Sequence, residues 1–185
     1  MSDFGRVLAL TIAAGTAVTG LFITPAQAVV SSDSDCTTKL KVGNSRYKGD
    51  IFHSYAKPAN GTSNHTGIYY TTKIVVEAPG PGSKSQSRTA ATLTKCGPVH
   101  KMYVRTTQAV RDAAADHAYR NLRFKPHDKH SNKNKHNGDH ELNGAELVWR
   151  AYMAANVDLD HNGGTAVHAD DIKNDAGTVI YSTRR

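Results

Sequence analysis

Cysteine is scarce in this sequence of 185 residues, which contains only Cys36 and Cys96. Two cysteines exclude a fold held together by many disulfides, and a chain of this size can bury a sizeable core without them. The chain begins with features of an export signal, described next, and disulfides persist in oxidising compartments. We therefore expect one disulfide between Cys36 and Cys96.

Long apolar runs are absent after the first 28 residues. Arg6 precedes an apolar run from Val7 to Ile23, and Ala26-Gln27-Ala28 has the small-x-small pattern of a cleavage site. The run of ~17 residues is at the short end for a transmembrane helix. Residues 1–28 are therefore predicted to be a cleaved signal peptide of a secreted, extracytoplasmic protein. Retention of the segment as a membrane anchor is the alternative.

Acidic residues are fewer than basic ones, with 16 Asp and Glu against 23 Lys and Arg, for a net charge of +7. A basic exported protein is attracted to cell-wall polymers and other anionic surface polymers. The basic charge is concentrated between Arg123 and His136, in a tract almost without aromatic residues, so the stacking of nucleic-acid bases is not indicated. A surface protein that binds through this basic tract is one hypothesis for the function.

The patterning predicts a polar N-terminal lead-in at residues 29–47 and one α+β domain at residues 48–185. Runs of β-prone residues predict strands, and apolar residues that recur every three or four positions predict helices. The polar stretch 126–140 predicts a long loop. Because strands and helices are segregated, an α+β layer is favoured over a βαβ repeat. The expected strands are 48–52, 66–71, 73–78, 100–105 and 178–183, and the expected helices are 107–122 and 145–155.

One segment, from Leu142 to Tyr152, resembles the helix that carries the catalytic cysteine in permuted papain-like hydrolases of the NlpC type (YiiX/YycO-like). The family pattern is roughly Asn-Cys-Ser-x-Leu-Val-Trp-x-Ala-Tyr, so the cysteine position falls on Gly144. The resemblance continues in the family order through four further segments, which are Gly49-Asp50-Ile51-Phe52, Asn64-His65-Thr66-Gly67-Ile68-Tyr69, Val75–Gly82 and Val157–Gly164. It implies a permuted papain-like fold, with an antiparallel sheet packed against the nucleophile-position helix.

The resemblance places the family's histidine at His65 and its orienting carboxylate at Glu77. Active relatives hydrolyse or transfer amide or ester bonds, including those of cell-wall peptides and acyl lipids. Glycine has no nucleophile, and no serine or threonine lies within two residues of Gly144. The leading hypothesis is a non-catalytic binding protein that keeps the family cleft. The alternatives are an active hydrolase with an unrecognised catalytic group, or a displaced nucleophile at Cys36 or Cys96, which is disfavoured because neither precedes a helix-like segment.

Two segments are candidates for metal binding. Asp158, Asp160 and Asn162, followed by Gly163, match the first half of a calcium loop, although the twelfth position is Ala169, which has no ligating side chain. A simple turn is the alternative, because Asp, Asn and Gly are common turn residues. The second candidate is a group of four histidines in the long loop, for which a solvated loop is favoured over zinc or copper. These histidines are His127, His130, His136 and His140.

Overall fold

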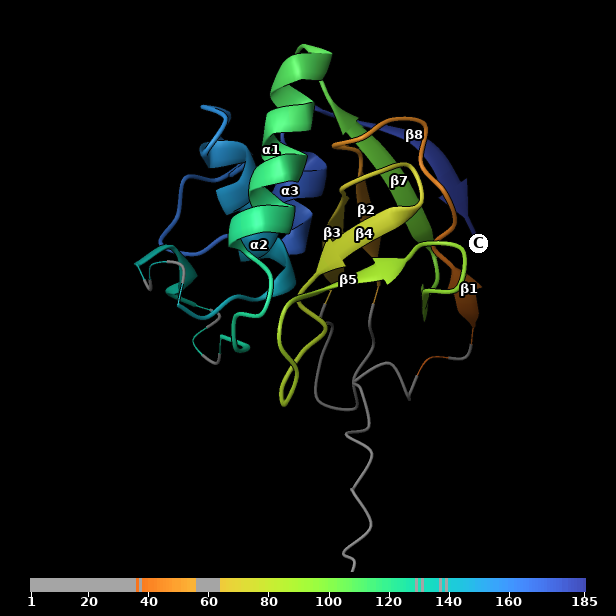
Figure 1. Ribbon diagram of the computed structural model, residues 1–185, viewed down its shortest axis with the longest axis horizontal. Coiled ribbons are helices and arrows are strands. Elements are labelled where there is room, and N and C mark those ends of the chain that lie inside the picture. Colours follow the sequence, from red (N-terminus) through yellow and green to blue (C-terminus); the bar gives the residue numbers. More distant parts are fainter. Residues whose placement is uncertain are drawn as a thin grey trace, which may run out of the picture.

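The computed structural model of the protein (Figure 1) describes residues 36, 38–55, 64–128, 130, 132–136, 138 and 140–185. The predicted signal peptide lies outside the described residues. The α+β prediction is confirmed, since antiparallel sheets are combined with a few helices. No helix in the described part is both long enough and apolar enough to cross a bilayer.

The main sheet has six antiparallel strands in the order β5-β4-β3-β2-β7-β8. Its members are β2 (Ile51–Ser54), β3 (His65–Tyr69), β4 (Ile74–Glu77), β5 (Gln86–Thr89), β7 (Val99–Val104) and β8 (Thr178–Arg184). A second, two-stranded sheet joins β1 (Lys39–Lys41) to β6 (Thr94–Cys96). The expected strands 66–71 and 73–78 correspond to β3 and β4, which pair as an antiparallel hairpin with Ile68 opposite Val76.

Three α-helices follow the strands on one side of the main sheet (Figure 1), and a short 3-10 helix, η2 (Asn134–His136), lies in the long loop. Helix α1 (Gln108–Asn121) is capped by Thr107, whose hydroxyl accepts from the Val110 amide. Helix α2 (Gly144–Met153) buries an apolar face that includes Leu147, Val148, Ala151 and Tyr152, and α3 (Ala169–Asn174) precedes β8.

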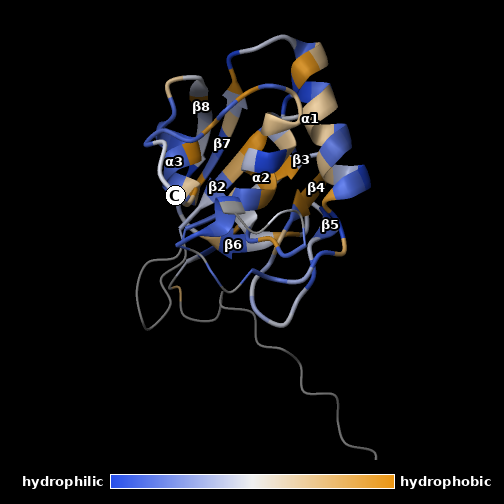
Figure 2. Cartoon of the chain, turned by 90° about the vertical axis from the view of Figure 1, so that its left-hand side faces the viewer, coloured by the Kyte–Doolittle hydropathy of each residue, from blue (hydrophilic) through white to orange (hydrophobic). Residues whose placement is uncertain are grey.

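The core is divided by the main sheet, as the alternation of side chains in β-strands requires. Ile51, Ile68 and Val76 face the helices, whereas the neighbouring Phe52 and Tyr69 belong to a smaller cluster on the other face. In Figure 2 strand β4 is largely orange, and its Val75 and Val76 are buried in the clusters on opposite faces of the sheet. The middle of the sheet is therefore a rigid support for any polar group placed at its edge.

The predicted lead-in at residues 29–47 contributes more to the fold than its polar composition indicated. Lys39–Lys41 form β1, and Val42 is fully buried in the smaller cluster. The predicted disulfide between Cys36 and Cys96 is confirmed, with a Cα–Cα distance of 5.6 Å. It attaches the chain before β1 to the end of β6.

Candidate functional site

Two neighbouring strands bring His65 and Glu77 together. His65 begins β3 and Glu77 ends β4, where Glu77 lies opposite Gly67 in the ladder. The Nε2 atom of His65 lies 2.7 Å from Oε2 of Glu77. A carboxylate at this nitrogen fixes the orientation of the imidazole ring and leaves Nδ1 to face another part of the site.

The Glu77 carboxylate is completely buried and is balanced by positive charge. The Lys95 ammonium, itself 4% exposed, lies 3.0 Å from Oε2, and Arg88 is 3.9 Å from Oε1. Burial alone would raise the pKa of Glu77, but the hydrogen bond and charge of His65, together with Lys95, lower this pKa to about 2. Glu77 is therefore ionised at neutral pH. Sequence reasoning missed Lys95, since a lysine in a short polar strand gives no sign of burial.

Gly144 lies directly beside this pair, at the first position of α2. A Cβ atom added to Gly144 would lie 2.8 Å from the backbone oxygen of Thr66 and 3.1 Å from both Nδ1 and Cε1 of His65. The structure therefore brings His65, Glu77 and Gly144 together. The start of α2 is packed so closely against β3 that a side chain fits at Gly144 only if the backbone shifts.

The first turn of α2 is held by its own polar residues. The Asn143 side chain accepts from the Glu146 amide, and the Glu146 carboxylate accepts from the Asn143 amide, as in a capping box. Glu146 is fully buried, and its Oε1 also accepts from Nε of Arg150 at 2.9 Å. Burial raises the pKa of Glu146 to about 7, even though Arg150 acts in the opposite direction.

The long loop at residues 126–140 is less solvated than expected, because Asp128 and Asn134 are buried. The amide group of Asn134 exchanges two hydrogen bonds with the backbone of Val167. His127 is half-buried, and burial is the main cause that lowers its pKa. Its sequence position indicated only a loop.

Three other residues of the resembling segments, Gly49, Asp50 and Tyr152, make contacts that stabilise the fold. Gly49 has φ +82, and a Cβ there would lie 2.5 Å from the Arg111 backbone oxygen, so this position requires glycine. The buried Asp50 accepts from the amides of Arg46 and Tyr47, and the Tyr152 hydroxyl donates to Gly49 O at 2.6 Å. The Gly-Asp turn and the α2 tyrosine therefore join the loop before β2 to α2.

The site has no thiol. Both cysteines of the chain are in the disulfide, so none is free. The hydroxyl of Thr66, the residue next to His65, donates to the Phe52 carbonyl and is buried. The arrangement can orient an imidazole beside the positive end of a helix, where it could bind a polar or anionic group. It has no thiolate for nucleophilic attack.

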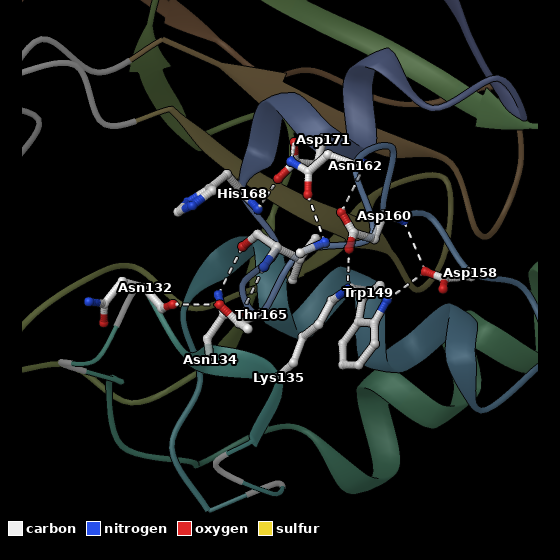
Figure 3. Close-up of polar contacts among 12 residues, drawn as sticks. Asn132, Asn134, Lys135, Trp149, Asp158, Asp160, Asn162, Thr165, His168 and Asp171 are labelled. Carbon is white, nitrogen blue, oxygen red and sulfur yellow. Dashed lines mark hydrogen bonds and ion pairs between the residues drawn. The ribbon is translucent and has the colours of Figure 1, made fainter.

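The candidate calcium residues lie in the turn between α2 and α3 (Figure 3). Oδ1 of Asp158 accepts from the Trp149 ring nitrogen at 2.8 Å and from the Asp160 amide at 3.0 Å. The other carboxylate, Asp160, pairs with the ammonium of Lys135. A cation supplied by the protein is thus already bound to this acid.

Asn162 completes the turn. Its Nδ2 donates to Oδ1 of Asp171 at 2.6 Å, and its Oδ1 accepts from the Gly164 amide at 2.9 Å. Among the described residues, no group of three or more His, Cys, Asp or Glu is arranged as a metal site. Calcium at this turn stays a prediction, and the contacts present are those of a self-stabilised turn.

The four histidines of the long loop do not form one cluster in the described part of the chain. His130 and His140 are exposed and His127 is half-buried, while only the backbone of His136 is described, in η2. A zinc or copper site made by these residues has no support in the described geometry.

A fully buried histidine, His53 on β2, has a partner that the sequence did not indicate. Its Nε2 lies 3.0 Å from Oδ1 of Asp170, the second residue of α3. Asp170 also accepts from Asn64 and pairs with Lys173 at 2.8 Å. Burial first, and then the charge of Lys173, lower the pKa of His53 to about 4, so this ring is neutral at pH 7.

Together, the fold and site define an α+β protein with an oriented His–Glu pair beside a helix start and without a thiol. A Bacillus subtilis (strain 168) protein named "Uncharacterized protein YycO" is 29% identical to this chain over 139 residues, which are 74% of this chain and 56% of that protein. The chain thus spans a little over half the length of this relative. No family model matches the chain, and no solved structure gives a significant match.

Proposed function

We propose that this is an exported protein with the permuted papain-like fold of the NlpC type, which has lost its nucleophile and acts as a binding protein. The observation that carries the proposal is the start of α2, where Gly144 contacts His65 without room for a side chain. The absence of a free thiol in the chain supports it. The order of the resembling segments and the similarity to the Bacillus subtilis protein support the fold.

The proposed ligand carries an amide or ester group, as in the cell-wall peptides or acyl lipids on which active members of the resembling family act. It would bind near His65 and the first turn of α2, where an imidazole and helix amides offer hydrogen bonds. The net charge of +7 favours ligands on anionic surfaces, including cell-wall polymers.

Titration of the isotope-labelled mature protein with soluble cell-wall peptides tests the binding proposal. We expect saturable shifts of the His65 and Gly144 resonances, without cleavage of the peptide by mass spectrometry. His65→Gln should weaken binding. Shifts elsewhere that leave His65 and Gly144 unchanged, or cleavage of the peptide, would contradict the proposal.

A cysteine at residue 144 tests whether Gly144 occupies the position of the lost nucleophile. Gly144→Cys should react with iodoacetamide at a pH below the usual thiol pKa of about 8.5, because His65 and the start of α2 favour the thiolate. Ala109→Cys, exposed in the first turn of α1, is the matched control with a helix start but no histidine partner. Equal pKa values for the two introduced thiols would show that His65 does not lower the pKa of a thiol at residue 144.

An active hydrolase that uses a water molecule in place of the thiol is the second candidate. The observation that favours it is the intact His65–Glu77 pair, with Lys95 3.0 Å from the carboxylate. An imidazole oriented by a carboxylate is the usual general base for water. This candidate requires turnover that depends on His65 and is insensitive to thiol reagents.

A further inference from the structure

A small pocket lies away from His65, at the end of the sheet formed by β7 and β8. Its lining residues come from the loop before β2, from β7, from α1 and from β8, and its cavity volume is about 120 Å³. Pockets that enclose drug-sized molecules start near ~300 Å³, so this one suits a single small group. The lining consists of two arginines and three tyrosines, which are Arg46, Arg111, Tyr47, Tyr103 and Tyr181.

One of the two guanidinium groups is held in place by backbone oxygens. Nη1 of Arg111 donates to the carbonyls of Val104 at 3.0 Å and Thr106 at 2.7 Å, and Nε and Nη2 donate to Oε1 of Gln108. All of these acceptors are neutral, and Arg111 forms no salt bridge with a described carboxylate. Its positive charge is thus positioned at the pocket without being neutralised by direct pairing.

The second guanidinium, that of Arg46, stacks on Tyr181, with 4.5 Å between Cζ and the ring centroid. Arg46 is exposed, and no described carboxylate forms a salt bridge with it. The Tyr181 ring is fixed in turn, because its hydroxyl donates to Oδ2 of Asp50 at 2.7 Å. Both arginines are thus placed by groups that leave their charge available to a ligand.

Further basic residues belong to the strands that line the pocket. Lys101 lies in β7, as Tyr103 does, and Arg184 lies in β8, as Tyr181 does. The neighbouring acid, Asp50, is buried and uses Oδ2 to accept from the Arg46 and Tyr47 amides and the Tyr181 hydroxyl. Asp50 is not among the residues that line the pocket, so both charged lining residues are arginines.

We propose that this pocket binds a phosphate group, carried either by a phosphodiester polymer or by a small phosphomonoester. Guanidinium groups bind phosphate oxygens in a planar, charge-assisted geometry, and a phosphate has enough oxygens to contact two arginines and a tyrosine hydroxyl. The pocket excludes His65, Glu77 and Gly144, so the site is independent of the function proposed for those residues.

The test is calorimetric titration of the wild-type protein with inorganic phosphate, glycerol 3-phosphate, poly(glycerol phosphate) and acetate at constant ionic strength. Arg46→Gln should weaken phosphate binding at least about tenfold, since a charge-assisted bond contributes about 1.5–3 kcal/mol. Arg120→Gln, an equal charge change at an exposed site near the end of α1, should leave the affinity unchanged.

Binding of the polymer but not of glycerol 3-phosphate would assign a polymeric ligand, and the reverse would assign a small phosphomonoester. Either result supports a phosphate site when Arg46→Gln removes the binding. The proposal is overturned if no phosphate probe binds saturably, if Arg46→Gln binds as the wild type does, or if acetate binds as tightly as phosphate. Loss of affinity in Arg120→Gln equal to that in Arg46→Gln would indicate non-specific charge attraction and would also overturn it.

Discussion

Two histidines on neighbouring strands of one sheet, the partly buried His65 and the fully buried His53, each have a carboxylate at Nε2. His65 pairs with Glu77 at 2.7 Å and His53 pairs with Asp170 at 3.0 Å. The acids differ in exposure, since Glu77 is fully buried and the Asp170 side chain is 44% exposed. A histidine–carboxylate pair alone thus does not identify an active site in this fold.

The two pairs differ in the surroundings of the second ring nitrogen, Nδ1. Nδ1 of His65 faces the start of α2 at Gly144, whereas Nδ1 of His53 is buried and has no hydrogen-bond partner within the described part of the chain. His65 is therefore oriented toward the start of α2, and His53 is enclosed. Under the proposed function, His65 is the histidine of the former catalytic site and Gly144 occupies the position of the nucleophile.

Removal of the Glu77 charge should have the largest effect on stability. Glu77→Gln leaves the buried Lys95 ammonium without its carboxylate, and breaking a buried pair costs about 3–5 kcal/mol. Asp170→Asn is the matched change in the second pair and should cost about 1 kcal/mol or less, because Asp170 is partly exposed. Urea denaturation measures both. Equal losses would show that the two pairs do not differ in the way the burial indicates.

Loss of the disulfide should lower the free energy of unfolding by about 4 kcal/mol, because the bond closes a long loop with a sequence separation of 60. The effect should also be local. Lys95 precedes Cys96 in β6, which pairs only with β1 among the described strands. In a double Cys36→Ser, Cys96→Ser variant, hydrogen exchange should increase in β6 and around His65 but not around His53. An equal increase in hydrogen exchange around His65 and around His53 would contradict this coupling.

The two pairs should lose stability in different pH ranges. The folded pKa of His53, about 4, lies below the ordinary 6.5, so the unfolded chain binds more protons between these values, and stability falls as the pH decreases from about 6.5 to about 4. The folded pKa of Glu77, about 2, lies below the ordinary 4.5, so its contribution is lost as the pH decreases from about 4.5 to about 2. Each contribution is on the order of 3 kcal/mol.

Thermal unfolding at a series of pH values measures these ranges. His53→Asn should flatten the profile between pH 4 and 6.5 while the acid limb below 4.5 remains. Glu77→Gln should remove the acid limb below pH 4.5 and leave the profile between pH 4.5 and 6.5 unchanged. A His53→Asn profile parallel to that of the wild type would show that folding does not lower the pKa of His53.

Gly144→Ala should change stability less than Glu77→Gln or loss of the disulfide does. Alanine favours helices over glycine, yet its Cβ would lie 2.8 Å from the Thr66 oxygen, and overpacking typically costs about 1–3 kcal/mol. Ala109→Gly in the exposed first turn of α1 measures the helix-propensity contribution by itself. NMR shifts should move at His65 and not at His53. A stabilised Gly144→Ala variant would show that the helix start is not tightly packed.

Much of the fold could be predicted from the sequence, because β3, β4, α1 and α2 have clear apolar periods. β1, β5 and β6 were missed, since Lys39–Lys41, Gln86–Thr89 and Thr94–Cys96 have no apolar alternation. Helix α3 is only six residues long and was not predicted.

At the site, the order of the segments that resemble the hydrolases led to His65, Glu77 and Gly144. Lys95 and the His53–Asp170 pair had no local signal. Their contacts arise from burial in the folded chain, and in the case of His53 from a residue 117 positions away. Tertiary packing decides which buried charges pair with each other, and a short sequence segment does not reveal that packing.

The most direct test of the central claim is the rate of hydrolysis of amide and activated-ester substrates by the wild-type protein and by His65→Ala. If Gly144 has removed catalysis, both proteins should give the same background rate, and iodoacetamide should change neither, because the chain has no free thiol. Turnover by the wild type that is lost in His65→Ala would contradict the account and would establish a hydrolase that uses His65 without a cysteine.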